Sequence, residues 1–443
     1  MKKFLRAAVF AIIALAVYFL LYNGFPKNRG ILTILLINIF LNAYLWGWVR
    51  ETTRTWKPSL RQMTVIFFWF PMMLFTGMVI YGFYKDFLDW DITIRTYTIS
   101  LFFIYFLCTF IPIATLFLAD IFRLIKMFFY RIFFHRSGGI KTFRRCTPLI
   151  FTGWAFGGLL FLLLACGMFF WQYDFRIREE VIRLPDLPKS FDGFRIAQFS
   201  DTHLGNWPCK EKLEVAVQMI NDQHPDVIFF TGDMFNYYTA EGKEFRDILR
   251  KLHAPMGIFA ILGNHDYGDY IKWPSPGEKE KNMRDLEEFY RLPGWNLLRN
   301  HNIILHKNSD SIAVIGVENW GYTHRFQRLG DIAKAQKGTE GMAVQLLLSH
   351  DPAHWEHIIS KEYPHIDITF SGHTHGGQFG INAMGLYWSP MAWLSEYWGG
   401  LYQNPQSQVI QYLNVNEGLG CIGYSGRVGI LPVITVFILK RPG

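Results

Sequence analysis

Long runs of apolar residues fill most of the first 171 positions of the chain. Each run comes close to or exceeds the roughly 20 residues that a helix needs to cross a bilayer. The runs are Phe4–Leu21, Ile31–Val49, Met63–Tyr84, Thr98–Leu118 and Leu149–Trp171. This pattern predicts an all-α bundle of about five transmembrane helices within a first domain, residues 1–175.

The first apolar run has a second interpretation as a signal peptide, because Lys2, Lys3 and Arg6 supply a basic start. The run is long for a signal peptide, however, and no clear small-residue cleavage site precedes Phe25-Pro26. We therefore favour a retained helix.

The loops between the apolar runs differ in basic residues. The N-terminus, the Arg50–Arg61 loop and the Arg123–Arg145 loop hold 14 Lys and Arg residues, against 4 in the alternate loops. Basic loops stay in the cytoplasm, so an odd number of spans predicts that everything after Trp171 is extracytoplasmic. No ionisable residue lies in the middle of a span. Asp120 is near an end, which favours an anchor over a transporter.

From about Arg178 the pattern changes to short apolar runs that alternate with amphipathic stretches. The strand-like runs are Phe194–Phe199, Val227–Thr231, Ile258–Leu262, Ile312–Val317, Val344–Leu348, Ile366–Phe370, Val409–Val415 and Pro432–Leu439. The helical stretches are Glu211–Asn221, Glu241–Leu252, Lys279–Arg291 and Pro352–Ser360. Such alternation predicts an α/β domain, residues 176–443, with helices covering sheets.

Charge separates the two domains. The whole chain of 443 residues carries a net charge of +8 and has a pI near 9.1. The basic excess lies in the loops that flank the apolar runs, whereas the second part is acidic overall. We therefore expect a lipid bilayer as a partner and no nucleic acid. The 5 cysteines are too few and too scattered for a disulfide framework. Only Cys209 and Cys421 lie in the second domain, and two free thiols are favoured over a bridge between them.

Five polar segments follow apolar runs of the second domain. They are Asp201-Thr202-His203, Gly232-Asp233, Gly263-Asn264-His265-Asp266, Ser349-His350-Asp351 and Gly372-His373-Thr374-His375. Ligands in α/β proteins gather beyond the carboxyl ends of strands, so these segments are expected to meet. Mixed imidazole and carboxylate ligands suit Mn, Fe or Zn better than Ca. The sequence therefore predicts a transition-metal site.

At these residues the chain resembles the calcineurin-like metallophosphoesterase family, over about residues 190–443. The ordered pattern D-x-H, G-D, G-N-H-D, H and G-H-x-H is complete. The resemblance implies two facing β-sheets flanked by helices, in a four-layer sandwich that holds two divalent metal ions. It implies the following roles: Asp201, His203 and His375 bind one ion, Asn264, His350 and His373 bind the other, Asp233 bridges them, His265 is the proton donor and Asp266 orients it.

Elementary chemistry is consistent with those roles. Two cations about 3.5–4 Å apart can hold a bridging hydroxide and clamp phosphoryl oxygens during in-line displacement. The leaving alkoxide then needs a proton, which an imidazole beside a carboxylate can supply.

Some neighbouring residues have simpler interpretations. Asp351 before Pro352 is typical of a helix N-cap followed by proline at the first helical position. His354 and His357 follow in that helix, so we expect them on its surface and away from metal. Glu417 precedes Gly418-Leu419-Gly420, where the family resemblance leads one to expect a basic residue. Arg427 is a candidate to replace that phosphate contact, although a surface arginine is the simpler expectation.

The segment Leu386–Trp398 is rich in Trp and Tyr. Such density is typical of a membrane interface, but the same residues could close the core between two sheets. We predict a membrane-anchored, metal-dependent phosphohydrolase or phosphodiesterase. Its candidate substrates include lipid-linked phosphoesters. The alternatives are a cytoplasm-facing pyrophosphatase of nucleotide-linked lipid precursors and a non-catalytic membrane sensor or transporter. The complete ligand set argues against the last.

Overall fold

The computed structural model of the chain describes residues 2–133, 143–323, 326–404 and 410–442. Two residues of the basic loop, Arg136 and Lys141, and the first residue of the predicted strand, Val409, lie outside the described residues. The chain divides into two compact units, Met1–Ala165 and Cys166–Gly443. We call them the membrane unit and the catalytic unit.

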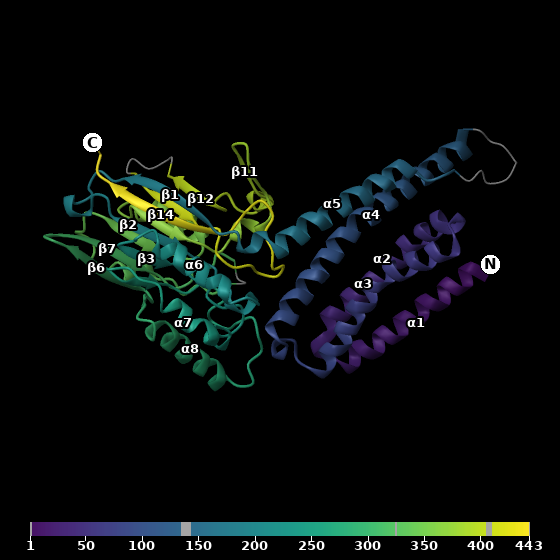
Figure 1. Cartoon of the computed structure of the whole chain (residues 1–443), viewed down its shortest axis with the longest axis horizontal. Helices are drawn as coiled ribbons and strands as arrows, with labels where there is room; N and C mark the ends of the chain where they lie inside the picture. Colours follow the sequence, from purple (N-terminus) through teal and green to yellow (C-terminus); the bar gives the residue numbers. More distant parts are fainter. Residues whose placement is uncertain (1, 134–142, 324–325, 405–409, 443) are drawn as a thin grey trace. The chain divides into compact units, whose positions relative to one another are not determined.

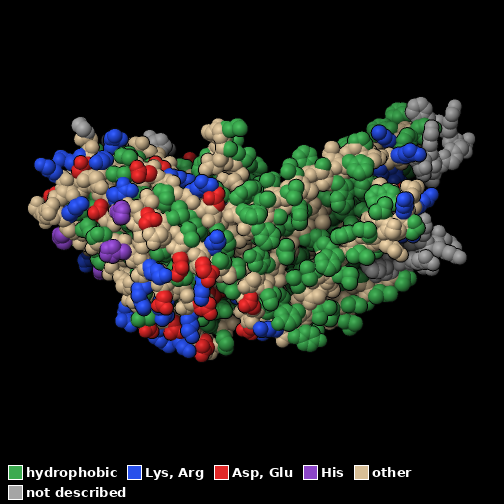
Figure 2. Space-filling view, in the orientation of Figure 1, with side chains coloured by type: hydrophobic (Ala, Val, Ile, Leu, Met, Phe, Trp, Pro, Cys, Tyr) green, Lys and Arg blue, Asp and Glu red, His purple; other side chains and the backbone are tan. Residues whose placement is uncertain are grey.

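Long helices make up the membrane unit. They are α1 (Lys2–Gly24), α2 (Arg29–Thr52), α3 (Pro58–Tyr84), α4 (Ile92–Phe133) and α5 (Thr147–Phe169). Apolar side chains cover much of their visible surface (Figure 2). Among the described residues, 4 helices are long and apolar enough to cross a bilayer, one fewer than the sequence predicts. The first apolar run forms α1, of which Ile12–Gly24 is a shorter apolar helix.

Close packing joins α2, α4 and α5. Leu45, Leu116 and Ile150 are fully buried in one apolar cluster that all three helices share. Gly153 of α5 lies directly against Thr115 of α4, as expected where a small residue allows two helices to approach. The charge of Asp120 near the end of α4 is met by Arg145, whose Nε lies 2.7 Å from the Asp120 carboxylate.

Two six-stranded sheets form the centre of the catalytic unit (Figure 1). The first has the order β1 (Arg176–Arg183), β14 (Val433–Lys440), β2 (Arg195–Phe199), β3 (Val227–Phe230), β4 (Ile258–Ala260), β5 (Asn296–Leu297). The second has the order β12 (Gly400–Gln403), β13 (Tyr412–Val415), β9 (Ile368–Ser371), β8 (Gln345–Leu348), β7 (Asp310–Gly316), β6 (His301–Lys307). A separate antiparallel hairpin pairs β10 (Ile381–Ala383) with β11 (Leu386–Trp388).

Alternating side chains of the strands build three apolar layers. In β3, Phe229 faces the core between the sheets, whereas Phe230 faces the helices. The helices over the first sheet are α6 (Glu211–Asn221), α7 (Arg246–Leu249) and α8 (Pro276–Arg291). Over the second sheet lie α9 (Ile332–Ala335) and the helical segment of α10 (Pro352–His354), a π-helical turn (Trp355–Ile359) and α11 (Ser360–Glu362). The predicted sandwich of helices and two facing sheets is thus confirmed.

Each predicted strand overlaps an observed one, and the strands that the apolar pattern misses in the two sheets are the edge strands β1, β5, β6 and β12. Edge strands carry polar residues that hinder pairing with other chains, and β1 reads Arg-Ile-Arg-Glu-Glu-Val-Ile-Arg. The predicted helix Glu241–Leu252 is shorter than expected, because a 3-10 helix, Thr239–Phe245, precedes α7.

Aromatic rings hold the two sheets together. Phe370 of β9 is fully buried and contacts Phe229 edge-on at a centroid distance of 5.0 Å and Phe437 of β14 at 5.1 Å. We expect Phe370→Ala to destabilise the catalytic unit by about 3–5 kcal/mol, because the cavity removes these contacts. Thermal unfolding measures the loss. Val215→Ala, at an exposed position of α6, is the control and should change little.

Candidate metal centre

The five polar segments all leave central strands of the two sheets at the carboxyl ends of those strands. Five of the predicted site residues have left-handed backbone, with φ of 49° at Asp201, 47° at His203, 58° at Asp233, 74° at His373 and 53° at His375. Residues with side chains rarely adopt this conformation, and it is concentrated at functional sites. The sharp turns therefore aim these side chains into one shared, buried space.

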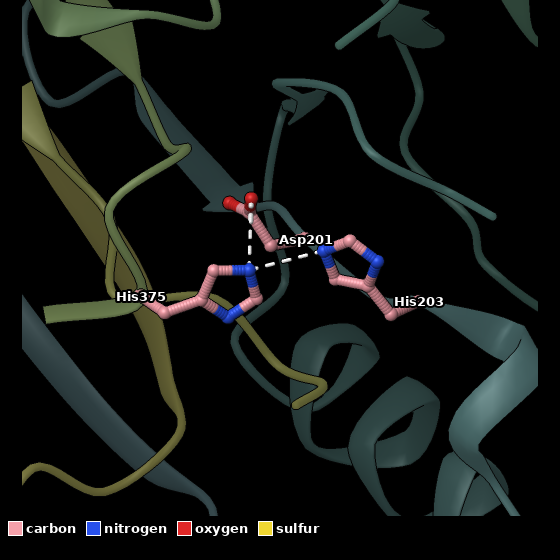
Figure 3. Close-up of side chains that lie close together, drawn as sticks. All are labelled: Asp201, His203 and His375. Atoms are coloured by element: carbon pink, nitrogen blue, oxygen red, sulfur yellow. Dashed lines mark hydrogen bonds and ion pairs between the residues drawn. The ribbon is translucent and has the colours of Figure 1, made fainter. Parts of the chain in front are cut away.

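The first group consists of Asp201, His203 and His375 (Figure 3). Nε2 of His203 lies 3.0 Å from Nε2 of His375, and the latter lies 3.4 Å from Oδ1 of Asp201. One ligand atom from each residue falls within 4.8 Å of the others. Atoms that bind one ion at about 2.0–2.2 Å lie about 3–4 Å apart, so this group could hold a metal ion.

The second group consists of Asp233, His350 and His373, with the same mutual limit of 4.8 Å. Oδ2 of Asp233 lies 3.2 Å from Nε2 of His350 and 3.7 Å from Nε2 of His203. Asp233 therefore adjoins both groups, which are separate but neighbouring.

A hydrogen bond to the backbone fixes the proton on Nδ1 of His350. Its Nδ1 donates to the carbonyl oxygen of Thr231 at 2.7 Å, because a carbonyl can only accept. In the neutral ring, Nε2 then presents a lone pair to the Asp233 carboxylate, an arrangement that becomes favourable when a cation lies between them. Oδ1 of the buried Asn264 also has no hydrogen-bond partner among the described residues. These orphaned acceptors fit divalent cations.

Burial sets the protonation of most groups in the site. It lowers the pKa of His203 to about 3 and lowers the pKa of His373 and His375, so these imidazoles are neutral near pH 7. Burial opposes the charged form of His350 as well, yet the Asp233 carboxylate raises the pKa of His350 to about 10. Burial raises the pKa of Asp201 to about 7. The Asp233 carboxylate thus favours a proton on His350, at the position where a metal cation fits.

Two family models match the chain. One is described as calcineurin-like phosphoesterase and matches residues 194–377. The other is described as probable calcineurin-like phosphoesterase, transmembrane domain, and matches residues 28–170. The uncharacterized metallophosphoesterase YkuE of Bacillus subtilis (strain 168) is 31% identical over 270 residues, which cover 59% of this chain and 84% of YkuE. The chain belongs to the calcineurin-like phosphoesterase family. It is a metal-dependent phosphoric ester hydrolase with several membrane-spanning helices.

Two further similar proteins are named as a pyrophosphatase and as a transmembrane protein. UDP-2,3-diacylglucosamine pyrophosphatase LpxG of Chlamydia trachomatis serovar D is 28% identical over 309 residues, covering 58% of this chain and 89% of LpxG. A transmembrane protein with metallophosphoesterase domain from Danio rerio is 26% identical over 275 residues, covering 60% of this chain and 57% of that protein.

His265 lies at the edge of the phosphoesterase site, and its side chain is only partly buried. Its backbone N–H donates to Oδ1 of Asp233 at 2.8 Å, and its Nδ1 donates to the carbonyl oxygen of Asn236 at 2.8 Å. The ring stacks on Tyr270 at a centroid distance of 4.1 Å, and the Tyr270 hydroxyl accepts from Nδ2 of Asn264 at 2.6 Å. Sequence reasoning missed Asn236 and Tyr270, because a carbonyl and a loop tyrosine carry no motif.

Asp266 does not lie where a direct partner of the His265 ring is expected. Its buried carboxylate accepts from the backbone N–H groups of Asp233, Met234 and Gly263 at 2.9–3.0 Å, and from that of Phe235 at 3.3 Å. No hydrogen bond to the His265 ring is found among the described residues. Asp266 instead ties together the loops that follow β3 and β4, and so positions both Asp233 and His265.

Glu417 and Arg427 are both buried and bonded within the protein. Glu417 is fully buried and pairs with Arg178 of β1 at 2.7 Å. Arg427 is also fully buried, which contradicts both expectations for it, a phosphate contact and a surface arginine. Its Nη2 donates to the carbonyl oxygens of Glu417, Gly418 and Gly420, and its Nη1 to that of His375 at 3.4 Å. It is a structural clamp on the loops around the metal centre.

The helical segment after His350 only partly follows the sequence expectation. Asp351 accepts from the backbone N–H of Ala353 at 2.9 Å and caps the helix, which confirms the predicted role. His354 is buried rather than on the surface, because it stacks on Trp320 and pairs with Ser349 at 2.9 Å. His357 stacks on Tyr322. Neither belongs to a metal-binding group of the described residues. Cys209 and Cys421 are free thiols.

The Asp266 carboxylate suggests a test of loop positioning. We expect Asp266→Ala to lower stability by at least about 2 kcal/mol, because it leaves buried N–H groups unpaired, and to reduce metal retention because Asp233 shifts. Thermal unfolding and elemental analysis measure the two effects. The exposed Asp247→Ala is the control. Unchanged stability and metal content in Asp266→Ala would contradict the positioning role.

Proposed function

We propose that the protein is a membrane-anchored, dinuclear-metal phosphodiesterase or phosphohydrolase that cleaves lipid-linked phosphoesters. The observation that carries this proposal is the pair of neighbouring ligand groups with Asp233 between them. Catalytic sites with two metal ions need such a shared ligand, since the ions must lie about 3.5–4 Å apart.

Asp201, His203 and His375 would hold one ion, and Asn264, His350 and His373 the other, with Asp233 shared. The imidazole-rich set favours Mn, Fe or Zn over Ca. Bound divalent cations would polarise the phosphoryl group and lower the pKa of water. The protein supplies the geometry: the left-handed turns fix the ligands, and burial keeps three imidazoles neutral and able to bind metal.

His265 is our candidate for the group that protonates the leaving oxygen. Since its Nδ1 is engaged with the Asn236 carbonyl, Nε2 is the nitrogen left to exchange a proton with a substrate. The stack on Tyr270 and the backbone contact with Asp233 keep the ring beside the metal ligands. Asp266 supports this placement through the backbone of the loop.

His265→Ala separates proton donation from metal binding. We expect turnover of a soluble phosphodiester to fall by a factor of about 10²–10⁴, because a general acid is lost, while metal content stays near that of the unmodified protein. Elemental analysis and steady-state kinetics on the purified full chain measure both. His253→Ala, at an exposed position, is the control. Loss of the metals from His265→Ala, or full activity in that variant, would refute the proposed role.

The distribution of basic loop residues supports an extracytoplasmic catalytic unit. The loop between α2 and α3 and the loop between α4 and α5 belong to the basic set, and α5 leads away from that side. This inference depends on the loops around α2–α5 and is the same whether or not α1 spans the membrane. It favours a lipid-linked phosphoester that is exposed at the outer face.

The similarity to LpxG favours a second candidate function. LpxG is named a pyrophosphatase of a nucleotide-linked acylated sugar, and such a precursor would require the catalytic unit to face the cytoplasm. Orientation therefore separates the two candidates.

A reporter fused after Lys440 tests orientation. We expect alkaline phosphatase, which requires an oxidising compartment, to be active there, and green fluorescent protein to be dark when exported in unfolded form. Fusions at residue 56, in the first basic loop, should give the opposite pattern. An active cytoplasmic reporter after Lys440 would favour the pyrophosphatase of nucleotide-linked precursors.

A further inference from the structure

Several segments of the catalytic unit contain no Asp, Glu, Lys, Arg or His, and three of them pack together. These three are residues 166–173, 376–394 and 418–426. The second is 19 residues long and reads Gly-Gly-Gln-Phe-Gly-Ile-Asn-Ala-Met-Gly-Leu-Tyr-Trp-Ser-Pro-Met-Ala-Trp-Leu. Charged side chains are frequent elsewhere on the visible surface of this unit, interspersed with other side chains (Figure 2). Uncharged segments that expose large apolar side chains on a water-exposed domain call for a physical reason.

The three segments are packed against one another. The backbone N–H of Arg427 donates to the carbonyl oxygen of Gly167 at 3.3 Å, and Gly167 approaches the Tyr424 hydroxyl so closely that a Cβ there would lie 2.7 Å from it. Phe379 forms a β-bridge with Val428, and Gly380 donates to the Val428 carbonyl oxygen at 2.8 Å. The loop 421–428 therefore connects the last turn of α5 with the β10–β11 hairpin.

Large apolar side chains of these segments point into solvent rather than into the core. Met384, at the tip of the hairpin that projects near the β11 label in Figure 1, is fully exposed. Leu394 is 82% exposed, Trp393 78% and Phe170 69%. Trp398, in contrast, is buried against Tyr387. The aromatic segment Leu386–Trp398 thus divides: Ser389 and Trp398 are buried, whereas Leu386, Trp393 and Leu394 face outward.

We propose that this uncharged surface, which we call the apolar patch, seats the catalytic unit on the surface of the bilayer. Cys166–Phe169 is the last turn of α5, and the candidate span continues to Tyr173, so the patch is continuous with the point at which the chain leaves the membrane. Trp and Tyr prefer the membrane–water interface, and apolar side chains on a surface loop gain by entering the lipid. Because α5 already ties the patch to the bilayer, we take the bilayer to be the surface that the patch contacts.

The patch is coupled to the metal centre. The uncharged segment starts at Gly376, directly after His375, and Arg427 donates to the His375 carbonyl oxygen from the loop that joins the patch. Docking would therefore hold the ligand loop at headgroup level. If the proposed function is correct, the site meets phosphoesters carried by lipid without extracting them from the membrane.

Hydrogen exchange on the full chain in phosphatidylcholine/phosphatidylglycerol nanodiscs, with one protein per disc, tests the docking. A hairpin of this size exchanges fast in water, so we expect the peptide 379–394 to exchange at least about tenfold more slowly in the unmodified protein than in Met384→Asp/Leu394→Asp. Both side chains are largely exposed, so aspartate there disturbs little packing. Val215→Asp, which adds a charge at an exposed apolar position of α6, should retain the slow exchange.

Activity distinguishes docking from a structural effect. The double variant should hydrolyse a soluble phosphodiester as fast as the unmodified protein and unfold at the same temperature, while its KM for a disc-borne phospholipid substrate rises. Equal exchange of peptide 379–394 in both proteins would overturn the proposal. Slow exchange that requires two proteins per disc would also overturn it and would identify the patch as a contact between copies. An inactive unmodified protein would refute the proposed function and leave the exchange comparison valid.

Discussion

The catalytic unit depends on two buried carboxylates, Asp201 and Asp233, that have little compensating positive charge around them. Asp201 and Asp233 are sequestered with histidines that burial keeps neutral, and only His350 takes up the opposing charge. Burying carboxylates in this way costs free energy unless positive charge accompanies them. Metal ions supply that charge in proteins of this family. Folding of the loops and binding of metal are therefore linked, and occupancy of the site stabilises the unit as a whole.

The central strands and the candidate metal ligands could be located from the sequence because both leave strong local signals. Buried strands such as β3 and β8 are continuous apolar runs, and each ligand follows the end of such a run. Edge strands lack that signal: 5 of the 8 residues of β1 are charged, and the strand lies at the edge of its sheet. Hydropathy alone therefore recovers the middle of each sheet and not its borders.

The roles of residues that contact distant parts of the chain could not be predicted from the sequence. The environment of Arg427 depends on four carbonyl groups brought together by folding, so a buried clamp and a surface arginine look alike in a linear chain. Glu417 is similar, because its partner Arg178 lies 239 positions away. The apparent departure from the family pattern at Glu417 thus reflects an ion pair between the first strand and the loop before β14. The expectation that His354 lies on the surface was wrong for the same reason, because Trp320, which covers it, comes from another loop.

Arg427 has one further implication, for protein engineering. Its side chain clamps the loops around the ligands, and its main chain bonds to Gly167, inside the final turn of α5. A water-soluble version of the hydrolase that begins at the first strand would remove this support and leave a polar backbone group and Tyr424 uncovered. The truncation should therefore begin upstream of Cys166. A soluble version then keeps the apolar end of α5, which has to be covered, for example by a fused helix.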